Sequence, residues 1–183
     1  MANTVPRIRR CTECGGPLTV ARKTAPYPES GLPNVVLVNV PVWKCVNGHE
    51  EIEIPAMREL HDVLVHQILR KPAPLTGAEI RFLRKRVGLS SKEFGARLGF
   101  HQVTVSKLET GRHRLQRPTD LLIRLYCAHL LAAKRGLQMP DDMLPVLEEL
   151  ERGMDVGQHR FEHLESNEPA DSTPAAEWRP VNA

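Results

Sequence analysis

The chain has 183 residues, which gives room for one ordinary domain or two small ones and excludes a large catalytic barrel. Hydrophobic residues make up 41% of it and aromatic residues only 4%, so a core is possible but must be aliphatic, and no apolar run reaches the roughly 18 residues of a bilayer span. Four cysteines are too few for a disulfide scaffold, and residues 1–10 lack the apolar stretch of a secretion signal, so we expect a cytoplasmic protein with no membrane partner.

The positive charge is concentrated in one stretch. Residues 76–117 contain 10 Lys or Arg and three Glu, a net charge of +7, although the whole chain carries only +3. Residues 154–183 contain two basic and six acidic side chains. A basic stretch of this kind is typical of a surface that binds a polyanion, and the alternative is a solvated basic face.

The first 55 residues are predicted to form a small β module. Residues 18–20 and 35–43 are rich in β-prone side chains, and residues 50–54 alternate polar and apolar side chains before a proline. Three prolines and a glycine break the pattern over residues 24–34.

Helical spacing of the apolar residues begins at Ala56. Residues 56–75 are predicted to be a connecting helix and a proline-containing linker, and residues 76–153 an all-α domain. Thr76 and Glu79 form a capping box at the start of this domain. Its helices are expected at residues 76–87, 91–98, 102–110 and 118–136 and after Pro140.

Two further expectations concern the C-terminal part of the chain. A long helix is expected to begin at Pro118 and to run through Leu121, Leu122, Leu125, Leu130 and Leu131. Residues 154–183 combine three prolines and six acids with few aliphatic side chains, so we predict a disordered acidic tail. The predicted fold class is α+β, with the β module preceding the helices.

The sequence offers a complete set of ligands for a metal ion. Cys11 and Cys14 lie three positions apart beside two glycines, and Cys45 and His49 form a second pair around Gly48. Two ligand pairs on β turns are typical of structural zinc sites, in which four protein ligands surround the ion. We therefore predict a structural Zn²⁺ bound by Cys11, Cys14, Cys45 and His49.

Two other interpretations of the cysteines remain open at this point. One is a CxxC redox pair activated at a helix N-terminus, against which the strand-like flanks argue, and the other is cysteines that only pack. Four protein ligands would leave no coordination position for water. Because the sequence also lacks a hydrolytic triad, a paired-acid site and a Gly-rich phosphate loop, we expect no enzymatic activity.

The pattern of residues 92–111 is that of a helix-turn-helix. Apolar side chains fall at Phe94, Leu98, Phe100, Val105 and Leu108, while Gly95 permits close helix contact and Gly99 a tight turn. Burying Val105 and Leu108 turns a polar, cationic face outward, which suits the major groove of DNA. The alternative is an ordinary helical hairpin within a bundle.

From Ile80 to Arg117 the chain resembles the Cro-repressor (XRE) helix-turn-helix family. The matching positions are Arg84, Gly88, Leu89, Phe94, Leu98, Gly99, Val105, Ser106, Leu108, Glu109 and Gly111. The resemblance implies that Arg84 pairs with Glu109 and that Gln102, Val103, Thr104 and Lys107 face the bases. The amide of Gln102 can pair with adenine, Lys107 can reach guanine acceptors, and Val103 offers an apolar contact to a thymine methyl.

The complete predicted DNA-binding set includes residues that flank the second and third helices of this domain. Ser91, at the start of the second helix, and the basic residues of the loop after the third helix are expected to face phosphates. The set comprises Ser91, His101, Gln102, Val103, Thr104, Ser106, Lys107, Arg112, His113, Arg114 and Arg117.

The order of a CxxC β module, a connecting helix and this domain resembles the MqsA-type antitoxins, also described as YgiT-type zinc-finger/helix-turn-helix proteins. The resemblance spans about residues 8–135. It implies structural zinc, a homodimer on a palindromic operator of double-stranded DNA, and a toxin partner, typically an mRNA-cleaving ribonuclease, held by the N-terminal module. It also implies a bacterial protein associated with the nucleoid.

Three functional hypotheses follow from the sequence. The first is a sequence-specific DNA-binding repressor that regulates its own operon with a toxin. The second is a protein-binding adaptor or antitoxin whose zinc module blocks a toxin, with DNA binding secondary. The third is a thiol oxidoreductase, which requires a labile thiolate at Cys11 or Cys14.

Overall fold

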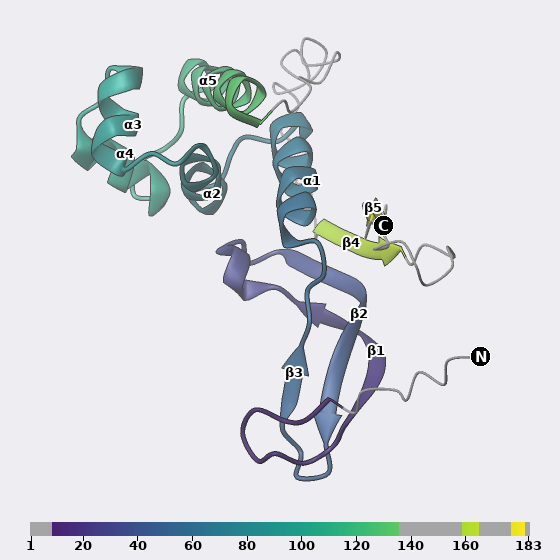
Figure 1. Ribbon diagram of the computed structural model, residues 1–183. Coiled ribbons are helices and arrows are strands. Elements are labelled where there is room, and N and C mark those ends of the chain that lie inside the picture. Colours follow the sequence, from purple (N-terminus) through teal and green to yellow (C-terminus); the bar gives the residue numbers. More distant parts are fainter. Residues whose placement is uncertain (1–8, 136–158, 165–176, 182–183) are drawn as a thin grey trace.

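The computed structural model describes residues 9–135, 159–164 and 177–181 (Figure 1). A β-sheet forms one end of the molecule and a group of helices the other, with α1 (Met57–Arg70) between them. The fold is α+β, as predicted, with the sheet region first and the helices after it. Among the described residues, no helix combines the length and the apolar character that a bilayer span requires.

The sheet is built on a long antiparallel pair. β1 (Leu18–Pro26) pairs with β2 (Val35–Cys45) from Leu18 opposite Cys45 to Pro26 opposite Val36, with one register shift after Lys23. A short 3-10 turn, η1 (Pro28–Ser30), connects the two strands, and β3 (Glu50–Ile52) pairs with the far end of β2. The alternation of buried valines and leucines along β2 places one face of the sheet against the helices.

The prediction of a disordered tail is wrong for two segments. β4 (His159–Leu164) pairs in parallel with Val35–Val38 of β2, and β5 (Glu177–Val181) pairs with β4. Phe161 and Trp178 supply the reason, because both side chains are buried in the main core. Burial of these two aromatic side chains removes a large apolar area from water. The average composition of this acidic, proline-containing segment does not reveal that area.

The helices begin and end close to the predicted positions. The predicted capping box is confirmed: the Thr76 amide donates to the Glu79 carboxylate at 2.7 Å, and the Glu79 amide donates to Thr76 Oγ1 at 3.3 Å. Gly88 and Gly99 end two helices in the left-handed conformation, with φ of 76° and 75°. The helices after α1 are α2 (Gly77–Val87), α3 (Ser91–Leu98), α4 (Gln102–Glu109) and α5 (Arg117–Arg135).

The buried face of α5 includes a charged residue. Leu122 and Leu125 are 43% and 44% exposed, whereas the fully buried residues of this helix include Ile123, Cys127 and the charged Arg124. The reason is that the guanidinium of Arg124 reaches the end of α1, which turns the two leucines toward solvent. The helix predicted after Pro140 lies outside the described residues.

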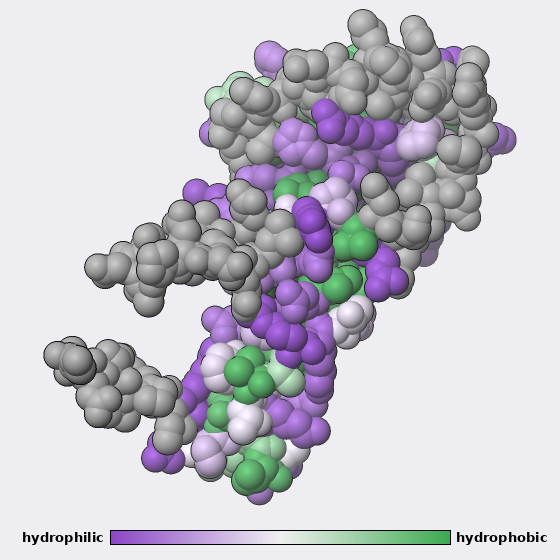
Figure 2. Space-filling view, turned by 90° about the vertical axis from the view of Figure 1, so that its right-hand side faces the viewer, coloured by the Kyte–Doolittle hydropathy of each residue, from purple (hydrophilic) through white to green (hydrophobic). Residues whose placement is uncertain are grey.

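The main core is continuous from the sheet to the helices. Buried leucines and isoleucines of α1, including Leu60, Leu64 and Ile68, belong to the same cluster as Leu37 of β2 and Leu83 of α2. The helix predicted as a connection is therefore part of the core. On the face shown in Figure 2, hydrophobic residues are interspersed among hydrophilic ones over the lower, sheet end of the molecule.

Candidate metal centre and nucleic-acid interface

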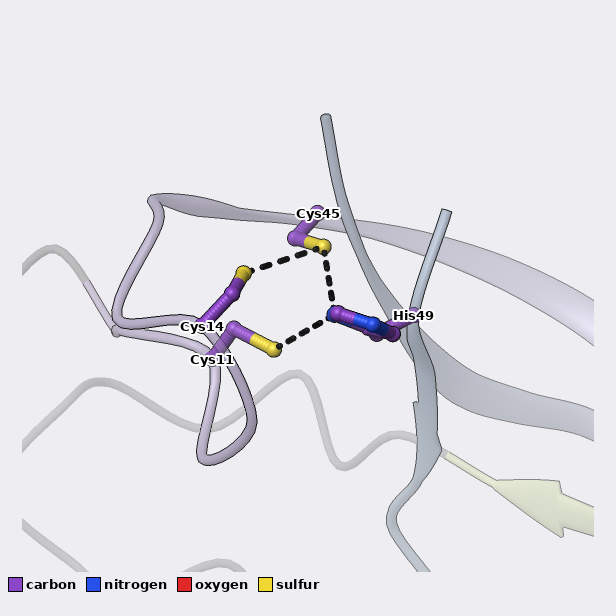
Figure 3. Close-up of side chains that lie close together, drawn as sticks. All are labelled: Cys11, Cys14, Cys45 and His49. Carbon is purple, nitrogen blue, oxygen red and sulfur yellow. Dashed lines mark hydrogen bonds between the residues drawn. The ribbon is translucent and has the colours of Figure 1, made fainter. Parts of the chain in front are cut away.

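The four predicted metal ligands meet at the end of the sheet farthest from the helices (Figures 1 and 3). Cys11 and Cys14 lie in a turn before β1, closed by the Cys11 amide donating to Gly16 O at 2.9 Å. Cys45 ends β2 and His49 precedes β3, in a turn closed by the Cys45 amide donating to His49 O at 3.1 Å. All four ligand atoms lie within 4.8 Å of one another.

Distances between these atoms match a tetrahedral metal site. A zinc ion with Zn–S bonds of about 2.3 Å and Zn–N bonds of about 2.0 Å would separate two sulfurs by about 3.8 Å and a sulfur from a nitrogen by about 3.5 Å. The Sγ atoms of Cys14 and Cys45 are 3.7 Å apart, and His49 Nδ1 lies 3.5 Å from Cys45 Sγ and 3.6 Å from Cys11 Sγ. These three distances support the cluster as a site that could hold a metal ion.

The surroundings of Cys14 favour a thiolate. Hydrogen bonds from the Gly16 backbone amide, the Asn47 side chain and His49 lower the pKa of Cys14 to about 6. A thiolate is the form of cysteine that binds metals. The turn that carries Cys11 and Cys14 precedes a strand, so neither cysteine has the helix N-terminus that activates a CxxC redox pair.

The helix-turn-helix is built from α3 and α4. An added Cβ at Gly95 would lie 2.5 Å from Phe100 O, so the predicted close contact requires glycine there. Val105 and Leu108 of α4 are buried, as expected. The pairing of Arg84 with Glu109 is confirmed, with Arg84 Nη2 donating to Glu109 Oε2 at 3.1 Å.

Most predicted DNA-facing side chains are exposed. Thr104 and Ser91 are half-buried, and α4 carries the rest of its polar face toward solvent. The exposed members of the set are His101, Gln102, Val103, Ser106, Lys107, Arg112, His113, Arg114 and Arg117. The polar face of α4 and the basic side chains that follow it therefore lie at the surface of the described part of the protein.

Two local details refine the prediction. α3 begins at Ser91, as predicted, and Ser90 is its N-cap, because Ser90 Oγ accepts from the Glu93 amide at 3.2 Å. His101 caps α4, with its Nδ1 accepting from the Val103 amide at 3.3 Å. The spacing of Ser90 and Glu93 is itself a capping-box signal and could have identified the first cap.

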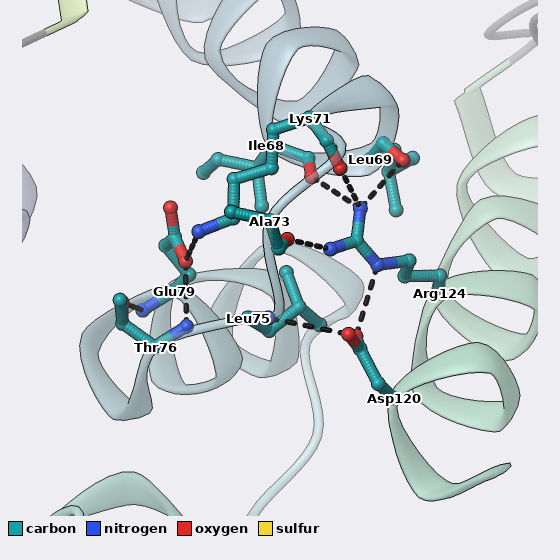
Figure 4. A network of polar contacts seen from close by, with 9 residues as sticks. All are labelled: Ile68, Leu69, Lys71, Ala73, Leu75, Thr76, Glu79, Asp120 and Arg124. Carbon is teal, nitrogen blue, oxygen red and sulfur yellow. Dashed lines mark hydrogen bonds and ion pairs between the residues drawn. The ribbon is translucent and has the colours of Figure 1, made fainter. Parts of the chain in front are cut away.

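A buried polar network fixes the helix-turn-helix to α1 (Figure 4). Arg124 of α5 donates to Asp120 Oδ1 at 2.9 Å and is fully buried. Its Nη1 and Nη2 atoms donate at 2.7 to 3.1 Å to carbonyls at the end of α1 and in the linker, namely those of Ile68, Leu69, Lys71 and Ala73. The last carbonyls of a helix lack intrahelical donors, so one guanidinium serves as the C-terminal cap of α1.

A second buried ion pair strengthens the same junction. Lys71 Nζ lies 2.6 Å from Glu79 Oε2, and both side chains are buried. Sequence reasoning missed this network, and the only local signal is the spacing of Asp120 and Arg124, four positions apart on α5. The linker of residues 71–75 is thus held between α1, α2 and α5.

Comparison with known proteins bears on the helical part of the chain. No curated protein and no solved structure matches the chain. Residues 76–137 match a family described as a helix-turn-helix domain, which covers α2 to α5. This match supports a DNA-binding regulator, and the Cys/His cluster is a possible metal site outside the matched residues.

Proposed function

We propose that the protein is a sequence-specific DNA-binding transcriptional repressor that binds a palindromic operator as a homodimer and carries a structural zinc ion. The observation that carries the proposal is the polar face of α4, exposed beside the basic side chains of residues 112–117 within a helix-turn-helix. Zinc held by four protein ligands would supply no catalytic water, so its contribution is to fold the end of the sheet.

In this proposal α4 enters the major groove. Gln102 and Lys107 hydrogen-bond to base edges, and Val103 contacts a thymine methyl. The phosphate backbone is bound by Ser91, by the loop side chains Arg112, His113 and Arg114, and by Arg117 at the start of α5. Buried Val105 and Leu108 support the proposal, because they fix which face of α4 points away from the protein.

Salt dependence of operator binding tests the proposal directly. If each subunit neutralises about three phosphates, log K should fall with log salt at a slope of about −5 for the dimer, because each neutralised phosphate releases counterions. The operator is obtained by selecting bound sequences from random duplexes, and the slope by titration at several salt concentrations. A slope near zero on the selected duplex would contradict the proposal.

Two exposed cations are expected to have different effects. Lys107→Ala should relax base preference, at a cost of about 1–3 kcal/mol at one base pair. Arg114→Ala should weaken binding to all sequences alike and reduce the magnitude of the salt slope by about 1. Specificity profiles from the same selection decide the assignment, and identical profiles for the wild type and Lys107→Ala would refute a base contact by Lys107.

The dimer is proposed to form through the exposed leucines of α5. Leu122 and Leu125 lie three positions apart on one side of the helix, so a second copy could cover both. The double variant Leu122→Glu/Leu125→Glu should sediment as a monomer and lose cooperative operator binding, because the new charges would face one another across a two-fold axis. Val46→Glu, at an equally apolar but distant site, is the matched control and should remain dimeric.

We also propose an antitoxin role, with autoregulation of a shared operon and a toxin bound at the sheet end. Val20, Val46 and Ile52 are exposed near the metal ligands and support a protein contact there. Co-purification of a small basic protein encoded by a neighbouring gene would be the expected observation. If no such protein co-purifies, the proposed antitoxin role is contradicted, whereas the proposed repressor function is unaffected.

A further inference from the structure

The hairpin formed by β4 and β5 closes an edge of the sheet that would otherwise be open. β2 pairs with β1 along one edge, while its other edge pairs with β3 at Val42–Lys44 and with β4 at Val35–Val38. Trp178 of β5 donates from Nε1 to Pro55 O at 2.9 Å, immediately before α1. The hairpin therefore contacts both the strand edge and the start of α1.

His163 occupies an unusual position in this hairpin. Its side chain is only 7% exposed, and within the described residues neither ring nitrogen has a hydrogen-bond partner. The ring packs edge-on against Trp178, with 5.2 Å between ring centroids. A neutral imidazole carries one donor and one acceptor, so its burial here already costs free energy, and a charged imidazolium would cost far more.

The groups around His163 would not compensate a positive charge. β2 contributes Asn39, whose Nδ2 donates to the backbone carbonyl of His163 at 3.1 Å, and β5 contributes Trp178. From β1, the Arg22 guanidinium bonds to Asn39 O at 3.0 Å and adds a like charge. Glu162 is bound to Arg179 across the hairpin, and among the described residues no carboxylate, from α1 or elsewhere, acts on the imidazole.

We propose that the C-terminal hairpin is a pH-sensitive latch, docked on β2 and Pro55 while His163 is neutral and released when that ring takes up a proton. Release uncovers the edge of β2 at Val35–Val38 and frees the start of α1. An uncovered edge strand is a template for pairing with another chain. The latch is independent of the proposed DNA-binding function, since its residues lie outside the helix-turn-helix.

The direction of the pH effect follows from linkage. Burial, and then the charge of Arg22, lower the pKa of His163 in the docked hairpin below its usual value of about 6.5. The released hairpin therefore binds more protons than the docked one. The equilibrium constant for docking of the hairpin is largest above about pH 6.5. It falls as the pH drops below that value, by up to about tenfold per pH unit.

Tryptophan fluorescence of the full chain tests the latch. The chain has two tryptophans, so Trp43→Phe leaves Trp178 as the only reporter. Lowering the pH from about 7.5 to about 5 should shift Trp178 emission reversibly to the red, because the side chain leaves the core. In the wild-type chain, deuterium exchange at the amides of residues 35–38 should accelerate over the same range, after correction for the pH dependence of intrinsic exchange.

Variants of two histidines identify the titrating group. In the Trp43→Phe background, His163→Gln and His163→Phe should abolish the emission shift. His66→Gln should retain it, because His66 is a half-buried histidine of α1 outside the hairpin. Metal retention is measured in the same samples, since metal binding by cysteine and histidine ligands is itself pH-dependent. A shift that persists without His163, or wild-type amides at residues 35–38 that stay protected at about pH 5, would overturn the proposal.

Discussion

Replacing Cys45 with serine is expected to unfold the metal end of the sheet and to leave the helices folded. Cys11, Leu18 and Cys45 form a small apolar cluster, with Trp43 packed against it, that is separate from the main core. A cluster of this size cannot hold two turns together without the metal, and in small zinc domains metal binding supplies about 10–16 kcal/mol of folding free energy. Chelation of the wild-type chain should have the same effect.

The measurement combines metal content with two spectroscopic signals. Wild-type protein should release one equivalent of zinc on denaturation, and Cys45→Ser should release less than a tenth of that, because three ligands bind far more weakly than four. The fluorescence of Trp43 should change on metal loss, while far-ultraviolet helical dichroism stays nearly constant. Glu13→Ala, in the same turn but without a ligand role, is the control and should keep its zinc. Full zinc content in Cys45→Ser would contradict the four-ligand site.

Features encoded by neighbouring residues were predictable from the sequence. The capping box at Thr76 and Glu79 and the turn at Gly99 each depend on a few consecutive residues, and both appear in the structure as expected. The four candidate metal ligands were predictable for the same reason, because each pair, such as Cys11 and Cys14, occupies one turn. The two turns are brought together by the antiparallel register of β1 and β2, which sets Leu18 opposite Cys45. This register is the one part of the site that is not encoded by neighbouring residues.

Features that depend on distant partners were not predictable. β4 is held by pairing with Val35–Val38 of β2, more than a hundred positions earlier in the chain, and composition alone argued against any structure there. In α5 the leucines predict a helix but not which of them are buried: Leu122 and Leu125 are exposed, whereas Leu131 is buried. The last carbonyls of α1 have no donors within their own helix, and their bonds to Arg124 set the rotation of α5 about its axis. The sequence of α5 does not reveal this distant partner.

Replacing Arg124 with methionine is expected to lower the free energy of unfolding by about 3–5 kcal/mol, as found when one partner of a buried ion pair is removed. The loss would leave Asp120 buried with a charge and without its guanidinium, although Asp120 Oδ2 still accepts from the Leu75 amide at 3.3 Å. Carbonyls at the end of α1, such as that of Leu69, would also lose their donor. Urea unfolding gives the free energy, and Arg97→Met, an exposed arginine of α3, should change it by less than about 0.5 kcal/mol.

A second substitution separates the ion pair from the cap. Asp120→Asn added to Arg124→Met removes the uncompensated charge and should recover part of the lost stability, whereas the donors to the α1 carbonyls remain missing. The loss in free energy of unfolding that remains in the double variant then measures the contribution of the C-terminal cap of α1. Because those carbonyls lie at the junction between α1 and the linker, the double variant should also loosen α1 from the helix-turn-helix, detectable as faster deuterium exchange in residues 71–75. An Arg124→Met chain within about 1 kcal/mol of the wild type would show that the guanidinium is not what joins the two parts.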